Sequence, residues 1–289
     1  MSTGIAKKEI KAGLVELGTK EGDVLLVHSS LSSFGKVDGG ADTVIDALLE
    51  VITESGTLCM PTNTYSFAKE HVEGHLNPPY HPLRTASKIG VMPEFFRFRP
   101  GAKRSLHPTH SVCVLGKDLD QILKNNKPTD SPFGLNSPFK KMFDLDAKVL
   151  FLGCGLKANS TVHAVEDWAG VPVSEAEEAL LVDEANHTAK VTVPSIPIGD
   201  RDFYHTESNL NKKLVESGLM RGIQIGQALV QMMKMRDIVK VMLTFLKIDP
   251  AIVLCDRPNC EFCSGRKKLV LQEKEKILKN MDSFGFIKS

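Results

Sequence analysis

Residues 23–60, DVLLVHSSLSSFGKVDGGADTVIDALLEVITESGTLCM, contain the pattern that decides the fold. Residues 23–27 form a nearly continuous apolar run that is typical of a buried strand, and the Ser/Gly-rich residues 28–40 indicate a loop. Apolar residues then recur at helical spacing over residues 41–53, and residues 57–60 predict a second strand that Pro61 stops. Because such a unit implies a right-handed crossover, we expect an α/β fold.

The remaining elements are expected from the same two periodicities. The expected helices cover residues 8–17, 87–98, 160–168, 224–246 and 269–289, and the expected further strands cover residues 111–115, 148–152 and 188–196. The helix over residues 224–246 is expected to be long, with a strongly apolar face. No Pro/Gly/Ser-rich linker divides the chain, so we expect a single domain with a mixed central sheet flanked by helices.

Composition excludes several classes of protein. The chain has 289 residues, 42% of them hydrophobic and 25% charged, which is ordinary for a globular protein and argues against disorder. Its net charge of +1 and its aromatic content of 6% do not indicate a binding surface for nucleic acid or an anionic membrane. Without a signal peptide or an apolar span, we expect a cytoplasmic protein whose six cysteines are thiols.

The loop after the first strand is the first candidate site. Ser29, Ser30, Ser32 and Ser33 offer hydroxyls, and the chain then enters a helix through a Gly39-Gly40 pair. Backbone N–H groups at a helix N-terminus suit a phosphate. Neither the dinucleotide nor the P-loop fingerprint is present, however, so anion binding and a plain connecting loop both remain open.

The second candidate is the run RSLHPTHS at residues 104–111. Arg104 can pair with a phosphate, while His and Ser can bind carbonyl or amide groups. His107 and His110 are also potential metal ligands, although no acidic or Cys partner stands beside them at ligand spacing. The alternative is a polar loop satisfied by its own hydrogen bonds, leading into the next strand.

The third candidate is NSTVHAVED at residues 159–167. A helix would place Asn159, His163 and either Glu166 or Asp167 on one face. A histidine held by a carboxylate is suited to act as a general base, although a lone histidine near a helix start is often structural.

Cysteine spacing gives a fourth candidate, because Cys255-x4-Cys260-x2-Cys263 offers three thiolates to zinc. No fourth ligand stands nearby in the sequence, so we expect no metal cofactor, and a structural zinc site remains an open alternative. Cys59, Cys113 and Cys154 lie in or beside apolar strands and are expected to be small core residues.

The order of these motifs resembles one family. The segments LLVHSSLSSFG, GGADTVIDALL, GTLCMPTNTYSF, RSLHPTHSV, SPFGLNSPFKKM, VLFLGCG and NSTVHAVE together resemble the aminoglycoside 3-N-acetyltransferases, and residues 225–246 resemble that family's closing helix. The resemblance covers about residues 5–246. It implies an acetyltransferase domain over residues 5–250 that differs from the GNAT fold, and it leaves residues 251–289 as a C-terminal extension.

The resemblance also implies roles for particular residues. It implies acetyl-CoA as co-substrate, transfer to an amine, and His163 as general base, with Glu166 or Asp202 orienting its ring. The contacts that it implies for the CoA arm are Ser29, Ser30, Leu31, Ser32, Phe34, Arg104, Ser105, Thr109, His110 and Ser111. Because no activated nucleophile is evident, direct attack by the amine is expected.

The expected acceptor is the 3-amino group of a 2-deoxystreptamine aminoglycoside, with another amine as the alternative. We expect a small-molecule enzyme that is a monomer or homodimer. Two other classes remain open: a zinc-dependent hydrolase that uses His107, His110 and His163, and a catalytically silent CoA-binding module.

Overall fold

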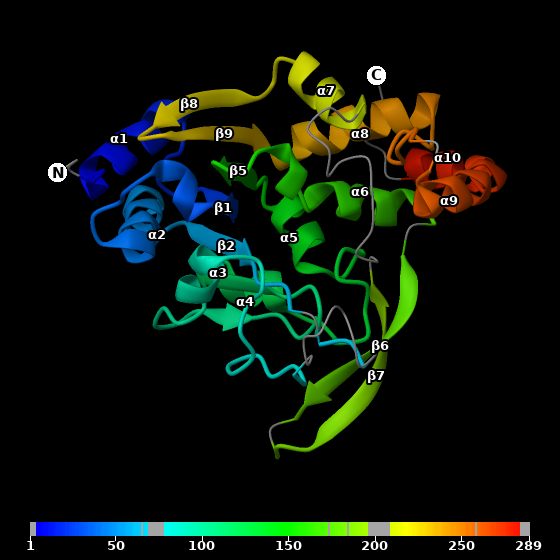
Figure 1. Cartoon of the computed structure of the whole chain (residues 1–289), viewed down its shortest axis with the longest axis horizontal. Helices are drawn as coiled ribbons and strands as arrows, with labels where there is room; N and C mark the ends of the chain where they lie inside the picture. The colour runs from blue at the N-terminus through cyan, green and yellow to red at the C-terminus, as the bar shows by residue number, and fades with distance from the viewer. Residues whose placement is uncertain are drawn as a thin grey trace.

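A seven-stranded mixed sheet forms the centre of the protein, with strand order β3-β4-β2-β1-β5-β9-β8 (Figure 1). The computed structural model describes residues 4–64, 66–68, 78–172, 174–183, 185–195, 209–257 and 259–283. The strands of this sheet are β1 (Val24–Ser29), β2 (Thr57–Pro61), β3 (Lys103–Arg104), β4 (Val112–Gly116), β5 (Lys148–Leu152), β8 (Arg221–Ile225) and β9 (Ala228–Lys234). The α/β fold predicted from residues 23–60 is confirmed.

The three central strands are parallel. β1 pairs with β2, with Val24 opposite Thr57, and on its other side with β5, with Leu25 opposite Lys148. The outer pairs are antiparallel, since β4 runs against β2 and β9 against β5. The carboxyl ends of β1, β2 and β5 therefore meet the starts of β4 and β9 at one edge of the sheet.

Helices cover both faces of the sheet, which explains why the central strands are apolar throughout. The helices are α1 (Lys7–Leu17), α2 (Gly40–Ile52), α3 (Val91–Phe96), α4 (Leu119–Leu123), α5 (Pro138–Asp144), α6 (Thr161–Ala169), α7 (Asn209–Glu216), α8 (Met235–Ile248), α9 (Glu261–Gln272) and α10 (Lys274–Ser283), with short 3-10 turns at Leu31–Phe34 and Leu156–Ala158.

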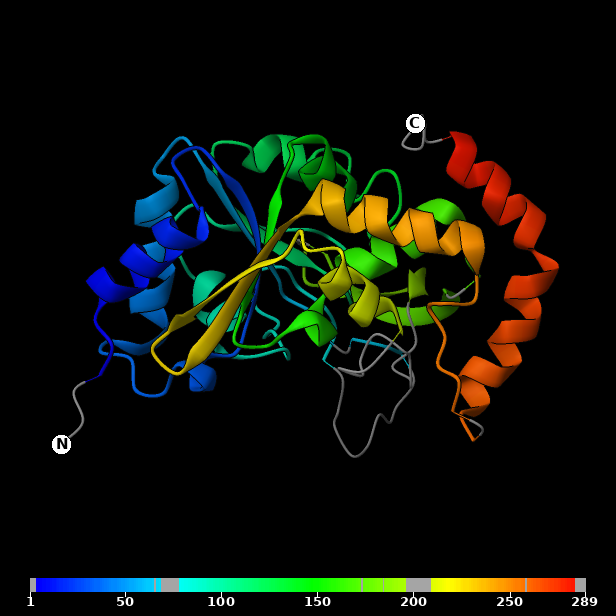
Figure 2. The ribbon, with the colours of Figure 1, turned by 90° about the horizontal axis from the view of Figure 1, so that it is seen from above.

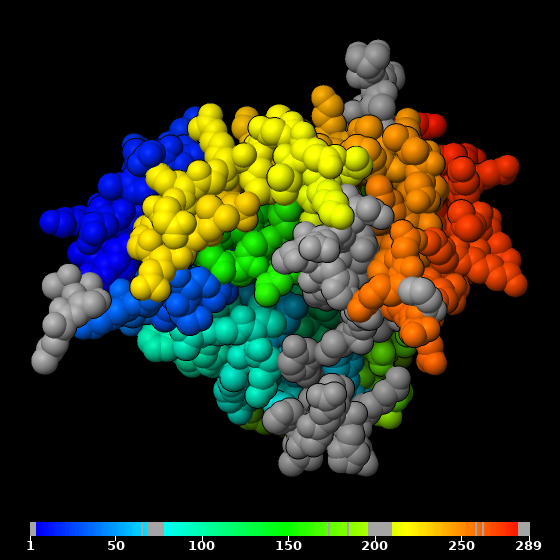
Figure 3. Space-filling view, turned by 45° about the horizontal axis from the view of Figure 1, so that its top comes forward, coloured from blue at the N-terminus to red at the C-terminus, as the bar shows by residue number. Residues whose placement is uncertain are grey.

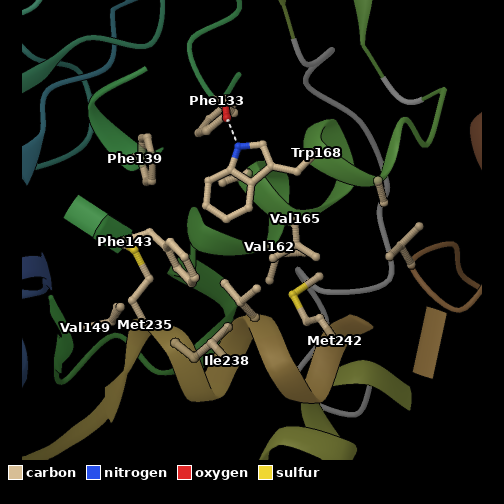
Figure 4. Close-up of a cluster of buried hydrophobic side chains, with 14 of the residues drawn as sticks. Phe133, Phe139, Phe143, Val149, Val162, Val165, Trp168, Met235, Ile238 and Met242 are labelled. Atoms are coloured by element: carbon tan, nitrogen blue, oxygen red, sulfur yellow. Dashed lines mark hydrogen bonds between the residues drawn. The ribbon is translucent and has the colours of Figure 1, made fainter. Parts of the chain in front are cut away.

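Alternation along β1 assigns side chains to the two faces. Leu25 and Val27 pack with the apolar residues of α1, α2 and α3, whereas Val24 and Leu26 pack with those of α4, α5, α6 and α8. Figure 4 shows the second of these cores, where Trp168 of α6 lies close to Phe143 of α5 and above α8. The Trp168 indole N–H donates to the carbonyl oxygen of Phe133 at 2.8 Å.

The helix expected over residues 224–246 is wrong in its first half. Residues 221–234 instead form the β8–β9 hairpin, which turns at Gly226 with φ 58° and lies at the sheet edge beside β5. Helix α8 begins only at Met235. Residues 228–234 are good helix formers, but Val230 and Met232 point to the core while Leu229 is exposed, which is strand alternation stabilised by pairing with β5.

Two smaller units lie away from the sheet. Strands β6 (Glu175–Val182) and β7 (Thr188–Ser195) form a separate antiparallel ribbon, and α9 and α10 cover the end of the molecule beside α6 (Figure 2). The single helix expected over residues 269–289 is wrong, because the described part of this range holds the end of α9 and the separate helix α10. Other expected elements differ from the structure mainly at their ends, such as α3, which covers only the middle of residues 87–98. No helix in the described ranges is long and apolar enough to cross a membrane.

Candidate active site

The Ser-rich loop is tied to the end of β5. The Ser30 backbone N–H donates to the Leu152 carbonyl at 2.8 Å, and the Ser33 hydroxyl donates to the Gly153 carbonyl at 2.8 Å. Gly153 has φ 68°, and a Cβ there would lie 2.4 Å from that of Ser33. Only glycine permits this close approach without strain, so the loop is held at the carboxyl ends of β1 and β5.

A hollow of about 680 Å³ opens beside this loop. It is lined by the loop itself, by the start of α2 and by the chain leading into α3, with Lys36 as the one cation among its lining residues. Among the described residues, the buried Ser29 hydroxyl has no hydrogen-bond partner, and a Cβ at Gly40 would meet no atom within 4 Å. These features suit the phosphates and the pantetheine amides of a CoA arm, because a helix N-terminus and a lysine favour negative charge.

Arg104, on strand β3, is a buried cation. Its guanidinium donates to the carbonyls of Thr85 and Thr62 at 2.5 and 2.7 Å and to the Ser111 hydroxyl at 3.0 Å. The Ser105 hydroxyl accepts from the Val112 N–H at 2.9 Å, and burial lowers the pKa of Arg104. The polar atoms of Arg104, Ser105 and Ser111 thus bind other groups of the protein, and the role of these three residues in CoA binding stays a prediction.

Arg104→Lys should therefore lower the free energy of unfolding by about 2 to 3 kcal/mol, because lysine cannot supply the guanidinium's fan of donors to these buried acceptors. Denaturant unfolding measures this loss, and Lys103→Met, on the exposed neighbour, should change stability by less than about 0.5 kcal/mol. A raised KM for acetyl-CoA in Arg104→Lys with unchanged stability would instead establish Arg104 as a cofactor contact.

His107 is a buried neutral histidine with both ring nitrogens in use. The backbone N–H groups of Thr109 and His110 donate to its Nδ1 at 3.3 and 3.0 Å, so Nε2 carries the proton and donates to the Pro194 carbonyl at 3.1 Å. Burial lowers the pKa of His107 to about 4. Because both nitrogens are engaged, His107 is a poor metal ligand, which removes support from the zinc-hydrolase alternative.

A second histidine, His28, is also buried in β1. Its ring stacks on Phe151 with centroids 5.6 Å apart, and burial lowers its pKa to about 3. Burial therefore favours the neutral form of both histidines near neutral pH.

These two histidines predict acid sensitivity. In the unfolded chain each binds a proton near pH 6.5, whereas the folded pKa values are about 4 and about 3, so stability is lost as the pH falls below 6.5. The free energy of unfolding at pH 5.5 should be about 2 to 3 kcal/mol below its value at pH 8. Denaturant unfolding at both pH values measures the difference, and His107→Gln should reduce it by about half.

His163 lies on the first turns of α6 and is 5% exposed. Its Nδ1 is 2.8 Å from Oε2 of Glu166, which is fully buried on the same helix. Asn159 lies two residues before this helix, and its side-chain oxygen accepts from the Thr161 N–H at 3.1 Å. The predicted contact of His163 with a carboxylate of the same helix is therefore present, through Glu166 rather than Asp167, whereas Asn159 lies outside the helix. Asp167 instead accepts from the Ser131 hydroxyl at 2.6 Å.

Phe133 joins His163 to the RSLHPTHS run. Its ring centroid lies 5.2 Å from that of His163 and 5.6 Å from that of His110, whose Nδ1 is 2.8 Å from the Thr109 hydroxyl. Tertiary structure thus brings the second and third candidates together around one aromatic ring. Asp202, the alternative partner of His163, lies outside the described residues.

A family model described as aminoglycoside 3-N-acetyltransferase matches residues 26–247. The chain belongs to this acetyltransferase family. Aminoglycoside N(3)-acetyltransferase IV of Salmonella sp is 30% identical over 86% of this chain and 90% of its own. The SPbeta prophage-derived aminoglycoside N(3')-acetyltransferase-like protein YokD of Bacillus subtilis is 36% identical over 55% of this chain, an alignment that spans 64% of that relative's length.

Solved structures of acetyltransferases share the fold of this chain. The apoenzyme of AAC(3)-IVa matches with a TM-score of 0.77 and 29% identity over 93% of this chain and 98% of its own. AAC-IIIb in its binary complex with CoASH matches with a TM-score of 0.75 and 25% identity over 85% and 97% of the two chains. The family membership and the acyltransferase class inferred from the sequence motifs are confirmed.

The predicted CoA contacts of the Ser-rich loop do not all line the hollow. Ser29, Ser30, Leu31 and Ser32 line the hollow, whereas Phe34 packs in the apolar core and is 2% exposed. Lys36 and the residues before α3 also line the hollow but were not singled out from the sequence. No motif marks them, because only the packing of α3 against α2 brings residues 89–92 to this loop.

Proposed function

We propose that this chain transfers the acetyl group of acetyl-CoA to the 3-amino group of a 2-deoxystreptamine aminoglycoside. The observation that carries the proposal is the buried His163–Glu166 pair, 2.8 Å apart, at the same edge of the sheet as the hollow beside Ser29. The relatives support both partners, since one solved relative is a binary complex with CoASH and another is a complex with apramycin.

Acetyl-CoA would lie across the carboxyl ends of the parallel strands, where ligands of α/β proteins commonly bind. Its phosphates would occupy the hollow near Lys36 and the start of α2. Since α2 and α6 cover opposite faces of the sheet, the pantetheine arm would cross the ends of β1 and β5 to bring the thioester toward α6.

The chemistry needs one base. The acceptor amine attacks the thioester carbonyl carbon, its proton passes to Nε2 of His163, the carbon–sulfur bond breaks, and CoA leaves. Glu166 holds Nδ1 of the ring and would stabilise the imidazolium that forms. Thr109 is a weaker candidate for the oxyanion donor than a loop amide, because its hydroxyl and its N–H both contact neighbouring histidines.

The experiment is a CoA-release assay on the purified protein with a panel of amines. Release of CoA from acetyl-CoA with a 2-deoxystreptamine aminoglycoside, together with an acetylated product at the 3-amino group, is the expected result. Turnover with another amine alone would change the acceptor and keep the acetyl transfer. Binding of acetyl-CoA without turnover on any amine of the panel would contradict the proposed reaction and favour a silent binding module.

A further inference from the structure

Three buried cysteines of the C-terminal extension come together beyond the region that matches the family. The sulfur atoms of Cys255, Cys260 and Cys263 all lie within 4.8 Å of one another. The three residues are 5%, 6% and 1% exposed. Within the described ranges this is the only group of three or more potential metal ligands, and the acetyl-transfer mechanism uses none of its members.

We propose that Cys255, Cys260 and Cys263 hold a zinc ion that fastens the C-terminal extension to the rest of the protein. Zinc binds Cys sulfur at about 2.3 Å, which places the sulfurs of a tetrahedral site about 3.8 Å apart. The folded thiols already meet that spacing within small side-chain adjustments. A water or another donor completes the fourth position.

The backbone at the start of α9 favours a thiolate at Cys260. Cys260 is the N-cap of α9, and its Sγ accepts from the Cys263 backbone N–H at 3.4 Å. The positive end of a helix and N–H···S hydrogen bonds both stabilise sulfur anions and orient them toward a metal. The Cys-x4-Cys-x2-Cys spacing, with two of the ligands on the first turn of a helix, is also common in structural zinc sites.

The three other cysteines of the chain lie on or beside strands of the central sheet, away from this cluster. Cys59 and Cys113 lie on the paired strands β2 and β4, and Cys154 follows β5. None of these three belongs to a group of metal ligands among the described residues. They provide matched controls for the proposed site.

The position of the cluster explains what an ion there would stabilise. Helices α9 and α10 pack beside α6, the helix that carries His163 (Figures 1 and 2). Arg266 donates to the Pro172 carbonyl at 2.9 Å, and Asn280 donates to the Ala169 carbonyl at 3.2 Å, at the end of α6. The space-filling view shows these helices forming one end of the molecule (Figure 3). Zinc would therefore hold the outer support of α6, independently of acetyl transfer.

The test begins with the metal content of the full chain purified without chelator. We expect one zinc per chain by elemental analysis. Replacement by Co²⁺ should give an intense sulfur-to-cobalt charge-transfer band together with visible bands of tetrahedral intensity. Chelation should lower Tm by roughly 5 °C or more, and zinc should restore it.

Variants identify the ligands. Cys260→Ser and Cys263→Ser should each lower zinc affinity by at least about 10-fold, whereas Cys154→Ser should leave zinc content unchanged. Cys260→His keeps a zinc ligand and should retain the metal if a serine variant fails to fold. Wild-type protein that takes up neither zinc nor Co²⁺ when both are supplied under reducing conditions would overturn the proposal, as would cobalt spectra without thiolate bands. Either result leaves the acetyl-transfer proposal intact.

Discussion

Replacing His163 with alanine should lower kcat by about 10²- to 10⁴-fold, because the acceptor amine then loses the base that takes its proton in the transition state. The KM for acetyl-CoA should change little, since the hollow beside Ser29 lies across the strand ends from α6. Steady-state release of CoA measures both parameters. His163→Ala should keep a folded structure, as α6 retains Val162 and Val165 in the core.

A substitution at Glu166 should give a smaller loss of activity than one at His163. Glu166→Gln keeps the shape of the side chain and can still contact Nδ1 of His163, but it removes the charge that would stabilise the imidazolium. We expect a smaller loss than in His163→Ala and a change in the pH dependence of kcat. His187→Ala, at an exposed histidine in the turn between β6 and β7, should leave kcat unchanged. Full turnover by His163→Ala would show that the base lies elsewhere.

Trp168→Ala should lower the free energy of unfolding by about 3 to 5 kcal/mol, the usual cost of emptying a large aromatic site in a core. Trp168 is 5% exposed, packs edge-on against Phe143 at 5.3 Å between ring centroids, and donates to the Phe133 carbonyl (Figure 4). The ring thereby joins α6 to α5 and to the segment that carries Phe133. Circular dichroism during denaturant unfolding measures the loss.

A matched variant separates packing from the hydrogen bond. Trp168→Phe keeps much of the ring volume but loses the indole N–H, so it should cost less than Trp168→Ala. Because Trp168 is the only tryptophan of the chain, its fluorescence in the wild type also reports unfolding of this core. A loss below about 1 kcal/mol in Trp168→Ala would contradict the role of this core in holding α6.

The sequence predicted the centre of the fold better than its edge. Residues 23–60 carry two local signals, an apolar run and a helical period of apolar residues. Both predicted the observed elements, because the central strands are buried on two faces and α2 buries one face against the sheet. In residues 224–234 the local signal and the structure disagree. Ala, Leu, Gln and Met favour a helix, yet β9 forms because its backbone groups pair with β5. Pairing partners far along the chain leave no trace in a local window.

The candidate site shows the same division. Asn159, His163 and Glu166 are close in sequence, so helical spacing alone placed the histidine beside its carboxylate. Phe133 is distant from both histidines that it contacts, and no spacing could have predicted that position. Arg104 looked like a phosphate ligand by composition, but the structure surrounds it with carbonyls of Thr62 and Thr85.

The sequence by itself determined the strand–loop–helix–strand unit of residues 23–60 and the histidine–carboxylate pair, because each depends on residues that are close together in the chain. Only the tertiary structure decided the β8–β9 hairpin, the hollow shared by the loop and the start of α3, and the contact of Phe133 with His110 and His163. These features depend on contacts between distant segments, whose geometry is set by the packing of the whole sheet and its helices.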